Sequence, residues 1–135
     1  MTVLVKRAGS ENVSALAMLE PTQDVASFVL KTVCDNGGKP CPPIIVGLGV
    51  GSTFDGSARL AKRALFRSLD EKENEFEAQM LEQMNNLSIG PMELGGRTTA
   101  LRVFIAKAPC HTAMLPVAVA IKCWADRKAR IRIKL

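Results

Sequence analysis

Aromatic residues are scarce in this chain, which has one tryptophan, no tyrosine and five phenylalanines among 135 residues. Aliphatic side chains and methionine must therefore fill the core of what is, by size, one globular domain. No apolar run approaches the ~20 residues that a membrane-spanning helix requires. Residues 1–7 are too short for a secretory signal and end in charges. These absences predict a cytoplasmic domain without membrane contact.

The four cysteines also lack a familiar spacing, because positions 34, 41, 110 and 123 contain no CxxC pair. A structural zinc ribbon is therefore not expected. In a reducing location, free thiols or metal ligands are favoured over disulfides. Cys34 and Cys110 are predicted to be packed free thiols, because a buried cysteine behaves as a small hydrophobe.

Cys41 and Cys123 are the candidate metal ligands. Cys41 lies in Lys39-Pro40-Cys41-Pro42-Pro43, where three prolines fix φ and remove backbone donors. A residue before a proline favours extended geometry, so Cys41 is predicted to be extended and stiff. A metal ligand benefits from such a frame, since its sulfur must meet a fixed atom. Two ligands alone do not complete a metal site.

The remaining motifs are weak by themselves. His111 is the only histidine, and a single histidine more often fills a structural role than a catalytic one. The glycine-rich run 47–52 follows a predicted strand and opens a helix, but it lacks the Lys-Ser/Thr ending of a phosphate-binding loop. Close strand–helix packing is the expected use of these glycines. The acidic segment 71–82 is expected to form a solvated helix face.

The net charge of +5 arises largely near the C-terminus, where residues 122–134 contain six basic side chains and one acid, Asp126. In 129–134 basic residues alternate with isoleucine, which predicts a half-buried strand with a solvated basic face. No aromatic residue interleaves for base stacking, so nucleic acid is not the expected partner.

Periodicity predicts a mixed sheet with helices packed on it. Asp24 is a candidate N-cap for a helix that Gly37-Gly38 stops, and Ser52 or Thr53 caps the next. A third helix follows the charged segment 70–74. Strands are predicted at 2–6, 44–50, 100–106, 117–121 and 129–134, a loop at 8–12, a helical turn or irregular segment at 14–19, and a glycine-rich loop at 89–97.

No repeat or linker divides the chain, so residues 1–135 are predicted to form one α+β domain with about three packed helices.

Several unusual sequence blocks occur together. They are Gly9-Ser10-Glu11-Asn12, residues 38–47, Thr53-Phe54-Asp55, residues 89–92 and 94–101, Ala108-Pro109-Cys110-His111, residues 115–119, and Cys123 with Ala125-Asp126-Arg127. In this order they resemble the alpha subunit, or N-terminal domain, of the iron-sulfur-dependent class I fumarate hydratases and L-tartrate dehydratases. The resemblance covers nearly the whole chain.

The resemblance implies a set of site residues. Cys41 and Cys123 match two of the three cysteine ligands of a [4Fe-4S] cluster whose remaining iron is open to the substrate. His111 matches a histidine that binds a substrate carboxylate. Gly9 lies in a substrate-contacting glycine loop, although Arg7 and Ala8 replace glycines usual there. Cys34 and Cys110 match no ligand position.

The resemblance also implies that the chain is a partial domain. The third ligand belongs to a Cys-Gln-Asp-Thr-Gly motif in the family's N-terminal segment, and this chain contains no such motif. That segment and a beta subunit are the expected partners, and they would supply the acid–base residues.

The implied activity is that of a hydro-lyase, which hydrates a dicarboxylic acid reversibly. Fumarate to malate is the first choice and L-tartrate the second, with the open iron acting as a Lewis acid. The alternative is a non-catalytic module that binds anions or RNA through the basic C-terminal stripe.

One geometric tension accompanies this assignment. An extended chain from His111 to Cys123 would separate the two by ~40 Å. A shared pocket requires residues 109–115 to double back along the strand. A structure with the two residues at opposite edges of the sheet would remove His111 from the site.

Overall fold

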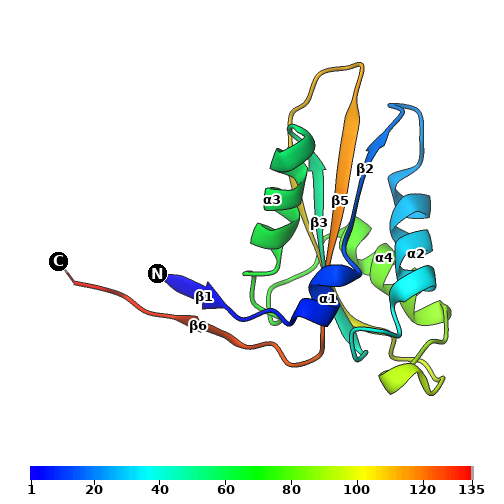
Figure 1. Cartoon of the computed structure of the whole chain (residues 1–135), viewed down its shortest axis with the longest axis vertical. Coiled ribbons are helices and arrows are strands. Elements are labelled where there is room, and N and C mark those ends of the chain that lie inside the picture. Colours follow the sequence, from blue (N-terminus) through cyan, green and yellow to red (C-terminus); the bar gives the residue numbers. More distant parts are fainter. Residues whose placement is uncertain (135) are drawn as a thin grey trace.

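The computed structural model describes residues 1–134 as a four-stranded mixed sheet with helices on both faces (Figure 1). The elements are, in chain order, β1 (Thr2–Leu4), α1 (Ala8–Asn12), β2 (Ala15–Leu19), α2 (Val25–Asn36), β3 (Ile44–Gly51), α3 (Phe54–Ala64), α4 (Glu75–Asn86), the 3₁₀ turn η1 (Pro91–Glu93), β4 (Ala100–Ala108), β5 (Leu115–Lys122) and β6 (Lys128–Arg130). A mixed sheet with four packed helices, one more than predicted, confirms the predicted α+β class. No helix within residues 1–134 has both the length and the apolar character to cross a bilayer.

Strand direction determines which loops meet. The sheet order is β2-β5-β3-β4, with β3 parallel to β4 and β5 antiparallel to both of its neighbours. The beginnings of β3 and β4 and the end of β5 therefore lie at one end of the sheet, the lower end in Figure 1. The loop from β4 to β5 lies at the upper end.

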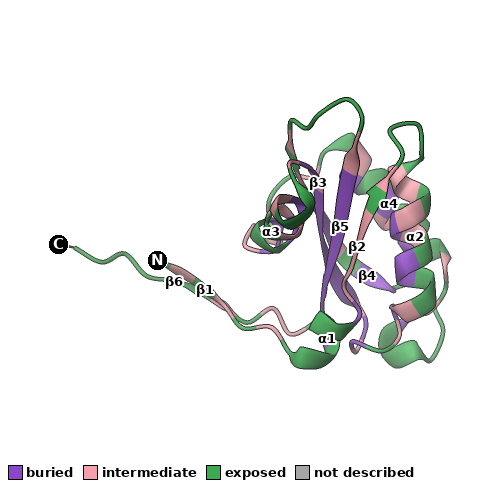
Figure 2. Ribbon diagram, turned by 45° about the horizontal axis from the view of Figure 1, so that its top comes forward, coloured by how far each residue is buried: buried purple, intermediate pink, exposed green. Residues whose placement is uncertain are grey.

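Successive side chains of a strand point to opposite faces of the sheet, so the two faces pack against different helices. On one face, Ile44, Val46 and Leu48 pack with α2 and α4. On the other face, Ile45 and Phe104 pack against α3. Each fully buried aliphatic or aromatic side chain contributes about 1.5–3 kcal/mol. Figure 2 shows β3 and β5 as the most deeply buried elements, between the two helical layers.

Close contact between α3 and β3 depends on two glycines. A Cβ atom at Gly49 would lie 2.0 Å from the Ser57 carbonyl oxygen, and one at Gly47 would lie 2.3 Å from that of Ala61. No side chain fits at either position, so the helix backbone rests directly on the strand. The glycine-rich run thus has the packing use that its sequence predicted.

Local capping explains where the helices begin. The Asp24 side chain accepts hydrogen bonds from the backbone N–H groups of Ala26 and Ser27, which confirms it as the cap of α2. Of the two candidates before α3, Thr53 is the cap, and it accepts from the Gly56 N–H. These bonds satisfy donors that a helix start would otherwise leave unpaired.

Three local predictions are wrong. Residues 8–12 form α1 and not a loop, and the segment predicted as a helical turn or irregular is β2. β2 pairs with β5 along its whole length, and this long-range pairing is absent from the local sequence signal. The basic strand is also shorter than predicted: β6 ends at Arg130, and Ile131 and Ile133 are exposed rather than half-buried.

The acidic helix α4 is not a purely solvated face, because the Glu77 side chain is completely buried. Its carboxylate accepts a hydrogen bond from the Ile105 N–H and pairs with Arg67. Burial alone would raise the pKa of Glu77, but the hydrogen bonds from Ile105 and Arg67 outweigh it and hold that pKa below its ordinary value. Glu77 thereby links α4 to β4.

We expect Gly49→Ala to lower the free energy of unfolding by about 2–3 kcal/mol, because the new methyl group must push α3 away from β3. Gly9→Ala is the matched control, since a Cβ there meets no atom within 4 Å. Urea unfolding followed by circular dichroism measures both. Equal stability of the two variants would contradict this account of the packing.

Candidate functional site

Cys41 and Cys123 lie at the same, lower end of the sheet, Cys41 three residues before β3 and Cys123 directly after β5. Ile45 of β3 pairs with Lys122 of β5, so continuing the register places Cys123 beside Ile44. Cys41 precedes Ile44 by three residues, which bounds the separation of the two cysteine Cα atoms at roughly 16 Å. The sequence alone did not show that the two cysteines lie at the same end of the sheet.

The alternation along β5 indicates that Cys123 approaches the face that α2 and α4 cover. Val119 and Ile121 belong to the core with α2 and α4, and Cys123 is the next residue in that alternation. Cys41 lies on the connection from α2 to β3, and the carbonyl of its neighbour Pro42 accepts the Met92 N–H at 3.0 Å.

The four thiols differ in burial. Cys123 is only 5% exposed and Cys41 is partly buried, whereas Cys34 and Cys110 are exposed. The prediction that Cys34 and Cys110 are packed in the interior is therefore wrong. Cys34 lies on the outer side of α2, and the Cys110 sulfur donates to the Met114 carbonyl in the loop at the upper end.

The backbone of Cys41 is left-handed, with φ at 58°, and not extended as predicted. The chain must turn from the end of α2 into β3 while Pro40 and Pro42 are both buried, and this tertiary constraint overrides the local preference. A left-handed residue other than glycine costs on the order of 1–3 kcal/mol and persists only where its surroundings fix it. Such strain is typical of functional positions.

A buried ion pair holds the segment that follows Cys123. The Lys122 side chain is 1% exposed and pairs with Asp126, which also pairs with Lys128 at 2.9 Å. Burial alone would raise the pKa of Asp126, but the hydrogen bonds from Lys122 and Lys128 outweigh it and hold that pKa below its ordinary value. Sequence analysis missed this network; the four-residue spacing of Lys122 and Asp126 was its only signal.

Gly9 lies on α1, which sits at the lower end of the sheet and packs against β5 (Figure 1). It is exposed, and no atom would approach a Cβ at this position within 4 Å. Gly9 is therefore at the same end as the two cysteines, on the side of β2.

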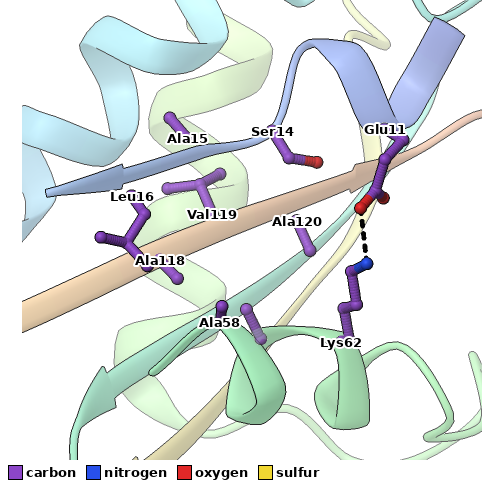
Figure 3. Close-up of a pocket in the computed structure, with 10 residues that line it drawn as sticks. Glu11, Ser14, Ala15, Leu16, Ala58, Lys62, Ala118, Val119 and Ala120 are labelled. Carbon is purple, nitrogen blue, oxygen red and sulfur yellow. Dashed lines mark ion pairs between the residues drawn. The ribbon is translucent and has the colours of Figure 1, made fainter. Parts of the chain in front are cut away.

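Beside α1, a groove of about 270 Å³ opens between α3 and the sheet (Figure 3). Small side chains such as Ala58 and Ala118 line it, and the ion pair of Glu11 with Lys62 closes one end. Hydrogen bonds from Lys6 and Lys62 hold the pKa of Glu11 below its ordinary value. Glu11 thus joins α1 to α3, which gives the Gly-Ser-Glu-Asn block a structural use.

His111 lies at the upper end of the sheet, away from the cysteines. Its loop is a local turn in which the Ala113 N–H donates to His111 Nδ1 and the Met114 N–H donates to the His111 carbonyl. The loop does not double back, and the eight residues of β5 span about 27 Å between His111 and Cys123. His111 and Cys123 therefore lie at opposite ends of β5, which argues against a site that the two residues share within this chain.

Within residues 1–134, no group of three or more histidine, cysteine or acidic side chains could hold a metal ion. The end of the sheet where β3 begins and β5 ends, called the corner below, contributes two thiols. That of Cys123 is nearly buried and that of Cys41 is partly buried. Thiolates are the ligands that soft metal centres select, and within residues 1–134 no third ligand joins these two thiols.

Sequence comparison defines the class of protein that this corner belongs to. The family model for fumarate hydratase (fumerase) matches residues 1–132. The chain therefore belongs to the fumarate hydratase family, which confirms the resemblance drawn from its sequence blocks.

The individual relatives carry more particular names. A Methanocaldococcus jannaschii protein provisionally named L(+)-tartrate dehydratase subunit alpha is 53% identical, over 96% of this chain and 48% of its own length. L(+)-tartrate dehydratase subunit alpha of Escherichia coli strain UTI89 is 31% identical, and that of strain K12 is 30% identical. Both of these alignments cover 84% of this chain and 39% of the relative. The chain thus spans half or less of the length of these relatives.

We expect Asp126→Ala to lower the free energy of unfolding at pH 7 by about 3–5 kcal/mol, because it leaves the Lys122 charge buried and unpaired. Asp35→Ala is the matched control, since it breaks an equally spaced but exposed pair with Lys31 and should change stability little. Urea unfolding at several pH values measures both.

The pH dependence has a definite sign. The pKa of Asp126 is depressed in the folded state, so its ionic contribution is complete above about pH 4 and is lost as the pH falls further. The difference between wild type and Asp126→Ala should therefore shrink in acid. A difference that is absent at pH 7, or that grows in acid, would show that the pair does not stabilise the folded chain.

Proposed function

We propose that this chain is part of an iron-sulfur hydro-lyase that adds water to, or removes it from, a dicarboxylic acid. Family membership over residues 1–132 supports the reaction class. The observation that carries the proposal is the position of Cys41, shortly before β3, and of Cys123, directly after the neighbouring strand β5, at the same end of the sheet.

The proposed substrates are fumarate, hydrated to malate, and L-tartrate, which loses water. The family's name favours the first and the names of the relatives favour the second. Each substrate carries two carboxylates, which need cationic or hydrogen-bonding groups. Gly9 is the substrate-contacting candidate of this chain at the lower end, through its exposed position on α1. His111 is left out of this centre because β5 separates it from Cys123.

The proposed cofactor is a [4Fe-4S] cluster. Cys41 and Cys123 would each hold it through a thiolate, and the third thiolate would come from polypeptide outside residues 1–135. When bound, the cluster supplies a Lewis-acidic iron that polarises the substrate hydroxyl. The chain's own residues orient the sulfurs: the left-handed Cys41 is fixed between buried prolines, and the Lys122–Asp126 pair anchors the segment after Cys123.

The proposed partners are a further segment of the alpha polypeptide and a beta subunit. The relatives are named as alpha subunits and are about twice as long as the matched region or longer. In this proposal, residues 1–135 are a partial hydro-lyase domain, and the acid–base residues lie in the partners.

The test uses the natural polypeptide that carries this chain, co-expressed with its beta subunit under anaerobic conditions. We expect Cys41→Ser and Cys123→Ser to lower the iron and sulfide content, the broad visible absorbance and the turnover of fumarate and L-tartrate. Cys34→Ser and Cys110→Ser are matched controls, because both thiols are exposed and lie away from the corner. Iron content that is indifferent to Cys41→Ser and Cys123→Ser would overturn the proposal.

A further inference from the structure

The loop that leads into β4 lies against the segment that carries the first of the two candidate cysteines. It comprises residues 89–99, and the beginning of β4 places it at the lower end of the sheet. The Met92 N–H donates to the Pro42 carbonyl at 3.0 Å, and the Ile44 N–H donates to the Thr99 carbonyl at 2.8 Å. The residues directly after that cysteine are therefore tied to the loop at two points.

The loop is compact and is held together by its own hydrogen bonds. The Gly95 N–H donates to the Ile89 carbonyl at 2.9 Å, which closes the neck of the loop. A Cβ atom at Gly90 would lie 1.9 Å from the Gly95 carbonyl oxygen, so the two sides of the neck touch. The Glu93 N–H donates to the Gly90 carbonyl at 3.2 Å inside the loop. The position of the neck therefore determines where the Met92 N–H lies.

The side chain of Thr99 holds this neck in place. Thr99 is fully buried, and its Oγ1 accepts a hydrogen bond from the Gly90 N–H at 3.1 Å. Its own N–H donates to Asn85 Oδ1 at 2.9 Å, at the C-terminal end of α4. Packing alone does not require a hydroxyl here, because valine has the same shape and burying a polar group is costly unless it is hydrogen-bonded.

The loop and the cysteine segment share an unfavourable backbone conformation. Met92 and Glu93 have φ angles of 54° and 62°, close to the 58° of Cys41. Left-handed residues other than glycine persist only where their surroundings fix them. The bond from Met92 to Pro42 joins the two left-handed stretches, and the Glu93 side chain rests on the backbone of Gly38. The conformation of Cys41 therefore depends on the loop.

We infer that Thr99 is a positioning residue for the thiol of Cys41. It anchors the loop at Gly90, and the loop fixes the left-handed backbone of Cys41 through the bond from Met92 to Pro42. The use of this thiol as a cluster ligand rests on the proposed function, whereas the contacts do not. A ligand that is already held in its bound conformation loses less freedom when the centre binds.

The test measures how fast iodoacetamide alkylates each cysteine of the natural alpha polypeptide in metal-free form, with every site quantified by peptide mass spectrometry. We expect Thr99→Val to raise the rate at Cys41 about fivefold, because loss of one hydrogen bond lets the segment open more often. Thr99→Ser keeps the hydroxyl and should stay within about twofold of wild type. Cys123, which is only 5% exposed, is the internal reference whose rate should not change.

Ser57→Ala is the matched control for loss of a buried hydroxyl. Ser57 is fully buried, and its Oγ donates to the Phe54 carbonyl at 3.0 Å within α3, away from the loop. This variant should leave the rate at Cys41 within about twofold of wild type. Circular dichroism and thermal unfolding show whether each variant remains folded.

A second variant decides the question if Thr99→Val does not fold. Asn85 is only partly buried, and its Oδ1 accepts the N–H groups of Thr99 and Ala100 at 2.9 Å each. Water can reach this end of α4, so Asn85→Ala should fold and should raise the rate at Cys41 about threefold. Asn86→Ala, at the exposed neighbouring position, is its control and should leave that rate unchanged.

Three results would overturn the inference: an unchanged rate at Cys41 in the folded variant, a rise at Cys123 as large as that at Cys41, or an equal rise at Cys41 in the control variants. Each would show that Thr99 supports only the fold in general. The proposed function fails separately. Wild-type polypeptide that incorporates no iron on anaerobic reconstitution would refute the cluster, while the alkylation rates of the metal-free form still decide the role of Thr99.

Discussion

The antiparallel pairing of β3 with β5 is the constraint on which the candidate site depends. Six consecutive residue pairs, from Ile45–Lys122 to Val50–Val117, hold the two strands in the centre of the sheet. Because the strands run in opposite directions, the beginning of one and the end of the other meet at one corner. Parallel pairing would have placed Cys123 at the opposite end of β3, away from Cys41. The direction of one strand thus selects which candidate residues lie together.

The corner is stable enough to hold an unfavourable backbone because the strands around it are buried on both faces. Gly47 and Gly49 let α3 rest on β3, while Ile44 and Val46 pack against α2 and α4. This rigid support can maintain the left-handed Cys41 and the buried charge of Lys122, both of which cost free energy by themselves. The two-stranded sheet of β1 and β6, by contrast, leaves Val3 and Val5 exposed.

Capping side chains and short apolar runs predicted those helices and strands whose ends are fixed by residues nearby in the sequence. Asp24 and Thr53 accept hydrogen bonds from backbone donors two or three residues ahead, so the starts of α2 and α3 could be predicted from sequence. The apolar run of β3 was equally clear, because it is buried on both faces. Predictions failed for α1 and β2, and for the burial of Cys34 and Cys110, where the outcome depends on distant segments.

By itself, the sequence determined the family, the starts of α2 and α3, the central strands and the two cysteines that belong to the proposed centre. Tertiary structure decided that Cys41 and Cys123 lie at the same end of the sheet, that His111 lies at the far end, and that Met1, Val3, Val5 and Ile131 stay exposed. The physical reason is that capping and periodicity act between near neighbours. Strand partners and their direction depend on contacts between residues more than 70 positions apart, as between Ile45 and Lys122.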